Sequence, residues 1–135
     1  MSEGGLLFLC VANSARSQMA EGLARARFGE RRLVQSAGSA PSAVHPHAVA
    51  VMAEVDIDIA NQWSKHVDTI DPTTVETIIT LCADEVCPAV LAKGATVLHW
   101  ALPDPAGSPG TDTDQLARFR DTRDNIARRL AQLDE

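Results

Sequence analysis

The chain has 135 residues, 45% of them apolar, with 12 Lys and Arg against 18 Asp and Glu. This length suits one ordinary globular domain and excludes a two-domain enzyme, a fibrous repeat and a disordered tail protein. The net charge of −6 disfavours a nucleic-acid or anionic-membrane partner, because such partners need a concentrated positive field, whereas a small anion in a local pocket is still allowed.

The cysteines are the residues most suited to chemistry. A domain of this size folds without a disulfide or structural metal, so a cysteine kept for a purpose is expected to be reactive. Three cysteines fit a secreted disulfide framework poorly, and the four scattered histidines give no zinc-ligand spacing. The apolar run at residues 6–12 is too short for a membrane span or a signal peptide. We therefore expect a cytoplasmic protein with nucleophilic or redox-active thiols.

Strand and helix patterns alternate along the chain. Apolar and β-branched runs predict strands at residues 6–10, 32–37, 77–82 and 95–100. Helical spacing begins at Arg16, at the pair His45-Pro46 and near Asp114. This alternation predicts an α/β fold, a single domain over residues 1–135 with a central parallel four-stranded sheet flanked by helices on both faces.

The spacing of apolar residues also predicts the buried face of each helix. The first helix, closed by Gly29, is expected to bury Met19, Leu23 and Ala26, with Glu21 elsewhere on the wheel. The inner positions of the two later helices are Val49, Met52 and Val55, and then Leu116, Phe119, Ile126, Leu130 and Leu133.

Three chemically useful residues follow predicted strands. Cys10 and Cys82 end two of them, and Asp104 lies in the loop after a third. Ligands of open parallel sheets bind at the carboxyl ends of the strands. We therefore expect these residues to share one crevice.

The segment after the first strand has the features of an anion-binding loop. Cys10 and Arg16 lie six positions apart across a strand-to-helix turn. The predicted oxyanion-binding loop consists of Val11, Ala12, Asn13, Ser14, Ala15 and Arg16. Its backbone N–H groups, the helix N-terminus and the Arg16 guanidinium can bind a tetrahedral oxyanion, and the same positive field favours the Cys10 thiolate, to which Ser17 could donate a hydrogen bond. The alternative is an inert buried cysteine at a strand end.

Asp104 and the two later cysteines have less specific patterns. Asp104-Pro105 is either a common turn or a carboxyl that protonates a leaving oxygen. Cys82 and Cys87 are either a redox pair, two unrelated core cysteines or half of a zinc site. In a helix their Cα atoms would be about 8.6 Å apart, beyond the roughly 7 Å limit of a disulfide, so a bridge requires the segment to unwind.

Several motifs in order resemble one family. They are CVANSARSQMAEG at residues 10–22, QSAG at 35–38, EVDIDI at 54–59, TLC at 80–82, CP at 87–88, HW at 99–100 and DPAG at 104–107. With them the chain resembles, over nearly its whole length, the thioredoxin-coupled arsenate reductases, which share the fold of the low-molecular-weight protein tyrosine phosphatases.

The resemblance implies a three-cysteine relay without a cofactor. Cys10 attacks arsenate held by the loop and Arg16, and Asp104 protonates the departing oxygen. Cys82 then attacks Cys10, arsenite leaves, and Cys87 carries the disulfide outward for reduction by thioredoxin. The segment between Cys82 and Cys87 is shorter here than in known members of the family.

Two other functions are open. A low-molecular-weight tyrosine phosphatase would use the same Cys10, Arg16 and Asp104 with water, but the chain has no tyrosine, and Ala106 and Gly107 follow Pro105 where such phosphatases carry aromatic residues. A non-catalytic redox or anion-sensing module is the third possibility. Weak residual phosphatase activity is expected of an arsenate reductase as well, because the first chemical step is shared.

The family resemblance also raises the question of a potassium ion beside the loop. The matching positions are Asn13, Glu21 and Ser36, and Lys65 stands where a further carboxylate is expected. A cation site that gains an ammonium no longer favours a metal, because two positive charges about 4 Å apart repel by roughly 4 kcal/mol at an effective dielectric of 20. We therefore expect no metal, with Lys65 replacing the ion, or else a solvated Lys65 without an ordering role.

Overall fold

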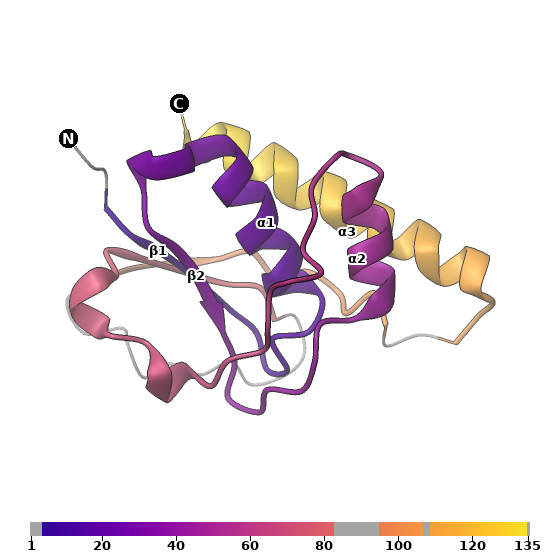
Figure 1. Cartoon of the computed structure of the whole chain (residues 1–135), viewed down its shortest axis with the longest axis horizontal. Helices are drawn as coiled ribbons and strands as arrows, with labels where there is room; N and C mark the ends of the chain where they lie inside the picture. The colour runs from indigo at the N-terminus through magenta and orange to yellow at the C-terminus, as the bar shows by residue number, and fades with distance from the viewer. Residues whose placement is uncertain (1–3, 83–94, 107–108, 135) are drawn as a thin grey trace.

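Four short strands form one parallel sheet in the computed structural model, which describes residues 4–82, 95–106 and 109–134 (Figure 1). The strands are β1 (Leu6–Leu9), β2 (Val34–Ala37), β3 (Thr77–Thr80) and β4 (Thr96–His99), in the order β2-β1-β3-β4. Each strand lies inside the range predicted for it, and all three pairings are parallel. The carboxyl ends of the strands therefore meet at one edge of the sheet.

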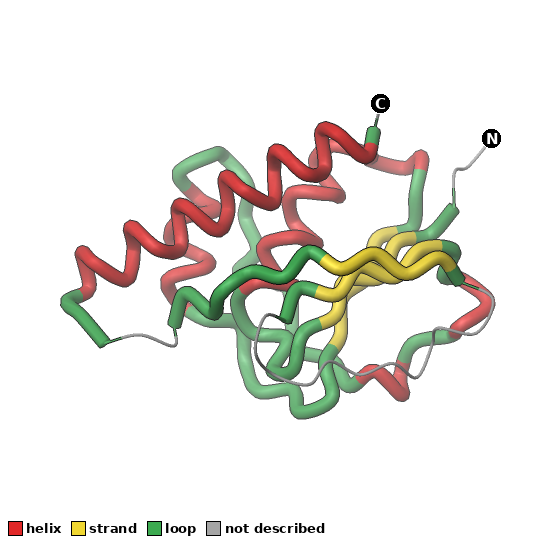
Figure 2. Tube along the Cα trace, turned by 180° about the vertical axis from the view of Figure 1, so that it is seen from behind, coloured by secondary structure: helices red, strands yellow, loops and turns green. Residues whose placement is uncertain are grey.

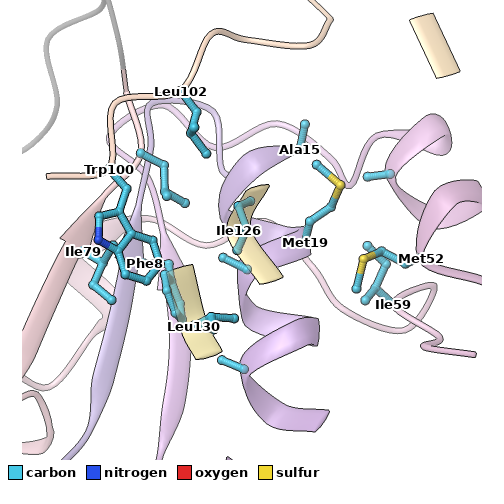
Figure 3. Close-up of a cluster of buried hydrophobic side chains, with 14 of the residues drawn as sticks. Phe8, Ala15, Met19, Met52, Ile59, Ile79, Trp100, Leu102, Ile126 and Leu130 are labelled. Carbon is cyan, nitrogen blue, oxygen red and sulfur yellow. The ribbon is translucent and has the colours of Figure 1, made fainter. Parts of the chain in front are cut away.

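The three α-helices pack together on one face of this sheet (Figure 2). They are α1 (Arg16–Phe28), α2 (Pro46–Ala53) and α3 (Asp112–Leu133). Phe8 of β1 and Ile79 of β3 pack with Met19, Met52 and Ile126 from the three helices (Figure 3). This main core contains most of the fully buried large side chains and supplies most of the hydrophobic stabilisation of the fold.

The opposite face is covered differently. In the described part of the chain it is covered by 3-10 helices, η2 (Val67–Thr69) and η3 (Pro72–Thr74). A second apolar cluster forms there, in which Val67 and Ile70 pack on Leu7, Leu9 and Ile78 of the sheet. The predicted α/β sheet with helices on both faces is confirmed, with short 3-10 helices on this second face.

The helices begin and end at residues that are typical helix caps. Thr111 caps α3 in a capping box with Asp114, so the helix begins at Asp112, two residues before the predicted start. Pro46 occupies the first turn of α2, and the side chain of His45 caps it. Gly29 ends α1 with a φ of 56°, a conformation that glycine adopts without steric cost.

Two predicted buried faces are wrong in part. In α1, Ala26 is exposed and Glu21 is only 2% exposed, because the helix is enclosed by the sheet and both other helices and Glu21 has buried polar partners. In α2, Val55 lies beyond the helix end at Ala53 and is 40% exposed. The apolar period identified these helices but did not fix how they are rotated.

Candidate active site

The ends of β1 and β4 bring predicted site residues to one small cavity. This cavity has a volume of about 110 Å³, and its lining residues are Cys10, Ala12, Ser14, Ala15, Arg16, Asp104 and Ala106. Residues separated by some 90 positions in the sequence therefore face the same space. Cys82, which follows β3, is partly buried at the same edge of the sheet but is not among the lining residues. The cavity is large enough for a small anion.

The loop between Cys10 and Arg16 turns its carbonyl groups outward. The carbonyl oxygens of Val11, Ala12 and Ser14 accept hydrogen bonds from the backbone N–H groups of Ala40, Ser42 and His45 at 2.9, 3.1 and 3.0 Å. Within the described part of the chain, the N–H groups of residues 11–15 have no acceptor. A cluster of backbone N–H groups without acceptors, in a loop that borders a cavity, favours binding of an anion.

The conformation of Asn13 makes the curled loop possible. Its φ is 48°, in the left-handed region that asparagine tolerates better than most residues. The Asn13 carbonyl oxygen accepts hydrogen bonds from Gln18 Nε2 at 3.0 Å and Ser64 Oγ at 2.7 Å. Neither donor is among the residues that line the cavity, so both bonds hold the loop without occupying the anion space.

Arg16 is held rigidly at the start of α1. The residue is 5% exposed, and its Nη1 donates to the carbonyl oxygens of Leu81 at 3.3 Å and Leu102 at 2.8 Å. These acceptors follow β3 and β4, so Arg16 joins three strand ends. A guanidinium fixed in this way loses little side-chain entropy when it binds an oxyanion.

A chain of hydrogen bonds orients the Cys10 thiol. Cys10 is 2% exposed, and its Sγ lies 2.9 Å from Ser17 Oγ. Asn13 Nδ2 donates to the same Ser17 oxygen at 2.7 Å. The amide orientation is fixed because Asn13 Oδ1 accepts from the backbone N–H of Lys65 at 2.8 Å. The Ser17 hydroxyl, which already accepts from Asn13, keeps its own proton available for the Cys10 sulfur, and such a donor would stabilise a thiolate.

The same chain continues to a buried carboxylate. Asn13 Nδ2 also donates to Ser36 Oγ at 3.0 Å, and Ser36 donates to Glu21 Oε1 at 2.6 Å. The Lys65 ammonium lies 3.4 Å from Glu21 Oε1, and Arg25 lies 3.2 Å from Oε2. The four positions predicted from the potassium-site pattern therefore form one connected polar cluster.

Asp104 is an exposed residue at the wall of the cavity. Its Oδ1 accepts a hydrogen bond from the N–H of Ala106, two residues later, at 2.9 Å, and this bond closes a turn. The turn and the acid interpretations of Asp104-Pro105 are thus compatible, because the turn holds the carboxyl beside the anion space.

The structure describes the two later cysteines only in part. Cys10 is a free thiol and Cys82 is in a disulfide. Cys87 and the rest of the segment at 83–94 lie outside the described residues, so the prediction for Cys87 is not tested.

Comparison with known proteins supplies the family. The family model for low molecular weight phosphotyrosine protein phosphatase matches residues 5–135. The chain belongs to this family. An arsenate reductase of Halalkalibacterium halodurans is 41% identical over 132 residues, covering 96% of this chain and 94% of that protein. One of Bacillus subtilis is 39% identical with the same coverage.

A solved structure gives the same answer for the fold. It is described as an arsenate reductase in the phosphate binding state, has a TM-score of 0.84 and 34% identity, and the match covers 97% of this chain and 96% of that one. The family resemblance predicted from the motifs is confirmed. No helix in the described part of this family member is both long and apolar enough to cross a bilayer.

Some residues that support the site in this low-molecular-weight phosphatase fold were not predicted from the sequence. Gln62 Nε2 donates to Gln18 Oε1 at 2.7 Å, and Gln18 in turn donates to the Trp63 carbonyl at 3.0 Å. His45 contacts the loop through its backbone. Gln18 is a polar residue in a predicted helix, which is a weak signal by itself, and its partners Gln62 and Trp63 lie more than 40 residues away.

Proposed function

We propose that the protein reduces arsenate to arsenite and serves arsenic detoxification, with Cys10 as the nucleophile. One observation carries the proposal, namely that the free Cys10 thiol, the unsatisfied loop N–H groups, Arg16 and Asp104 border one cavity of about 110 Å³. The relatives named arsenate reductase support arsenate as the substrate.

The first step is attack on arsenic. Arsenate binds to the N–H groups of residues 11–15 and to Arg16, and the Cys10 thiolate forms a sulfur–arsenic bond. One arsenic–oxygen bond breaks, Asp104 gives its proton to the departing oxygen, and water leaves. Ser17 stabilises the thiolate before attack through the 2.9 Å contact with its sulfur.

The second step is reduction by a thiol relay. The Cys82 thiolate attacks the Cys10 sulfur, the sulfur–arsenic bond breaks, and its electron pair reduces arsenic from the +5 to the +3 state. Arsenite leaves and a Cys10–Cys82 disulfide forms. Cys87 then attacks Cys82, which returns Cys10 as a thiolate. The pairing of β1 with β3 supports this route, because Cys10 and Cys82 follow neighbouring strands.

We infer that thioredoxin is the reductant and that the reaction occurs in the cytoplasm. A disulfide between Cys82 and Cys87 is the type of substrate that a dithiol protein reduces, and the cytosol keeps the three thiols in the state the cycle needs. Mycothiol or glutaredoxin would be the alternative electron donors.

A coupled assay tests the function. NADPH oxidation is followed with thioredoxin, thioredoxin reductase and arsenate. Wild-type protein is expected to turn over, and Cys10→Ser to show no turnover because the pocket does not ionise a hydroxyl. Turnover with glutaredoxin or mycothiol alone would contradict thioredoxin coupling, and a complete absence of arsenate turnover would contradict the proposed function.

A second candidate is phosphate-ester hydrolysis. The family model is that of phosphotyrosine phosphatases, and Cys10, Arg16 and Asp104 would serve either reaction. The cavity is small, and Ala106 rather than an aromatic residue lines it beside Asp104. We expect slow hydrolysis of p-nitrophenyl phosphate, and faster hydrolysis than arsenate reduction would favour the phosphatase.

We also propose that Lys65 takes the place of the potassium ion that the family resemblance implies. The donor set does not fit a metal, because Glu21 already has the Lys65 and Arg25 cations and the Ser36 hydroxyl as partners. The Lys65 ammonium also donates to the Trp63 carbonyl at 2.9 Å and lies 4.9 Å from the centre of the Trp63 ring. Lys65 then orders Asn13, and hence the loop, through Glu21.

A further inference from the structure

His45 joins helix α2 to the oxyanion-binding loop. Its backbone N–H donates to the Ser14 carbonyl at 3.0 Å, and its carbonyl accepts the first helical bond of this segment from Val49 at 3.2 Å. Its ring Nδ1 accepts the N–H of His47 at 3.1 Å and so caps α2. One residue therefore belongs to both the helix cap and the set of three backbone bonds that hold the loop.

The cap requires one protonation state of the ring. Nδ1 accepts a hydrogen bond from a backbone N–H, so this nitrogen carries no hydrogen of its own and the ring is the neutral tautomer with its proton on Nε2. The ring packs on the fully buried Phe119 of α3 and on His47, with centroid distances of 4.8 and 5.0 Å. These contacts fix the plane of the imidazole.

The charges around His45 act in opposite directions. Burial of the ring, and then the neighbouring His47, lower the pKa of His45 from its usual value, and the Asp104 carboxylate acts against this shift. Asp112 at the start of α3 lies 3.8 Å from His47 Nε2. The ring thus lies within electrostatic reach of Asp104 but is not among the groups that line the cavity.

We propose that His45 is a positioning residue for the oxyanion-binding loop. Its neutral ring holds the loop in place by capping α2, and protonation of the ring loosens the loop. The inference rests on the proposed use of this loop by Cys10. Protonation places a hydrogen on Nδ1, opposite the N–H of His47, and a positive charge at a helix N-terminus, where the helix dipole disfavours it. Both effects weaken the start of α2, where the His45 N–H donates to the Ser14 carbonyl and so holds the loop.

Two substitutions separate the cap from the charge. His45→Ala removes both, and His45→Asn keeps a good capping side chain that does not titrate. His66→Asn is the matched control, because His66 Nδ1 caps the 3-10 helix η2 by accepting from Asp68 at 3.0 Å and His66 makes no bond to the loop. Thermal unfolding of each variant reports whether it is folded.

The expected result in the coupled arsenate assay is a change in KM. Loss of a cap typically shifts an equilibrium about fivefold, so His45→Ala should raise the KM for arsenate about fivefold at pH 7.5 with little change in kcat. His45→Asn should restore the wild-type KM, and His66→Asn should leave it unchanged. Because burial lowers the pKa of His45 below its usual value of 6.5, the KM of the wild type should rise more steeply than that of His45→Asn only at pH values well below 6.5, where the wild-type ring gains a proton that asparagine cannot take.

The inference is overturned if the His45→Ala KM equals that of wild type, if His45→Asn does not restore it, or if the wild-type and His45→Asn pH profiles coincide. A binding assay makes its failure distinguishable from that of the proposed function. Sulfate protection of Cys10 against iodoacetamide, followed by peptide mass spectrometry, reports on the loop without turnover. A sulfate affinity about fivefold weaker for His45→Ala, and unchanged for His45→Asn and His66→Asn, supports the inference even if arsenate is not reduced. Equal sulfate affinities for all variants overturn it.

Discussion

A methyl group at Gly38 would overlap the backbone of the predicted oxyanion-binding loop. A Cβ at this position would lie 2.3 Å from the Val11 carbonyl oxygen and 2.6 Å from that of Cys10. The backbone of Gly38 is fixed on both sides, because its N–H donates to the Lys65 carbonyl and its own carbonyl accepts from the Val67 N–H, each at 2.9 Å. The loop must therefore move when Gly38 is replaced by alanine.

The size of the movement sets the expected effect. Ordinary contact begins near 3.4 Å, so Val11 must shift by about 1 Å, and a misplacement of this size in an active site typically costs about 100-fold in rate. Overpacking typically costs about 1–3 kcal/mol of stability, or roughly 4–12 °C in Tm at about 4 °C per kcal/mol. We expect Gly38→Ala to fold and to lose about 100-fold in kcat/KM for arsenate in the thioredoxin-coupled assay.

Gly29→Ala is the control for lost stability. Gly29 has a φ of 56° with no atom near its missing Cβ, so alanine there is strained by about 1 kcal/mol or more but lies at the far end of α1 from the loop (Figure 1). We expect it to lower Tm and to leave kcat/KM unchanged. Equal activity of Gly38→Ala and Gly29→Ala at a temperature where both are folded would refute the argument from close packing.

Three further predictions concern single side chains of the site. Ser17→Ala removes a hydrogen bond to a charged sulfur, which contributes about 1.5–3 kcal/mol, so iodoacetamide should alkylate Cys10 at least about tenfold more slowly at neutral pH; an unchanged rate would show that Ser17 does not stabilise the thiolate. Asp104→Asn should slow single-turnover adduct formation about 10²–10⁴-fold without weakening sulfate binding. An unchanged rate would show that Asp104 serves only to form the turn. Wild-type Tm and arsenate affinity should be equal in sodium and potassium at the same ionic strength, and Lys65→Asp should create a potassium preference; potassium stabilisation of the wild type would contradict the replacement of the ion by Lys65.

Local patterns were sufficient to predict the architecture and the main residues of the cavity. Each strand is a continuous apolar or β-branched run, and the carboxyl end of a parallel strand is a place that topology alone identifies. The positions of Cys10 and Asp104 at one edge of the sheet could therefore be predicted without any contact being known. The small residues between Cys10 and Arg16 were sufficient to predict a tight loop.

Long-range polar contacts could not be predicted in the same way. Glu21 looks like a surface residue on the helical wheel, and its burial depends on Ser36 and Lys65, which approach from elements distant in sequence. The bracing of the loop by residues 40–45 depends on where the chain goes after β2. Backbone bonds of this kind carry no side-chain pattern, and only the assembled fold contains them.

The central claim is that Cys10, Cys82 and Cys87 act in sequence, and the most direct measurement is the mass of the Cys87→Ser variant after one turnover. Reduced Cys87→Ser is mixed with arsenate, arsenite is quantified, and disulfides are mapped by peptide mass spectrometry. We expect one arsenite per protein, a loss of two hydrogens and a Cys10–Cys82 crosslink. Multiple turnovers by Cys87→Ser with thioredoxin, or arsenite release without that crosslink, would contradict the relay.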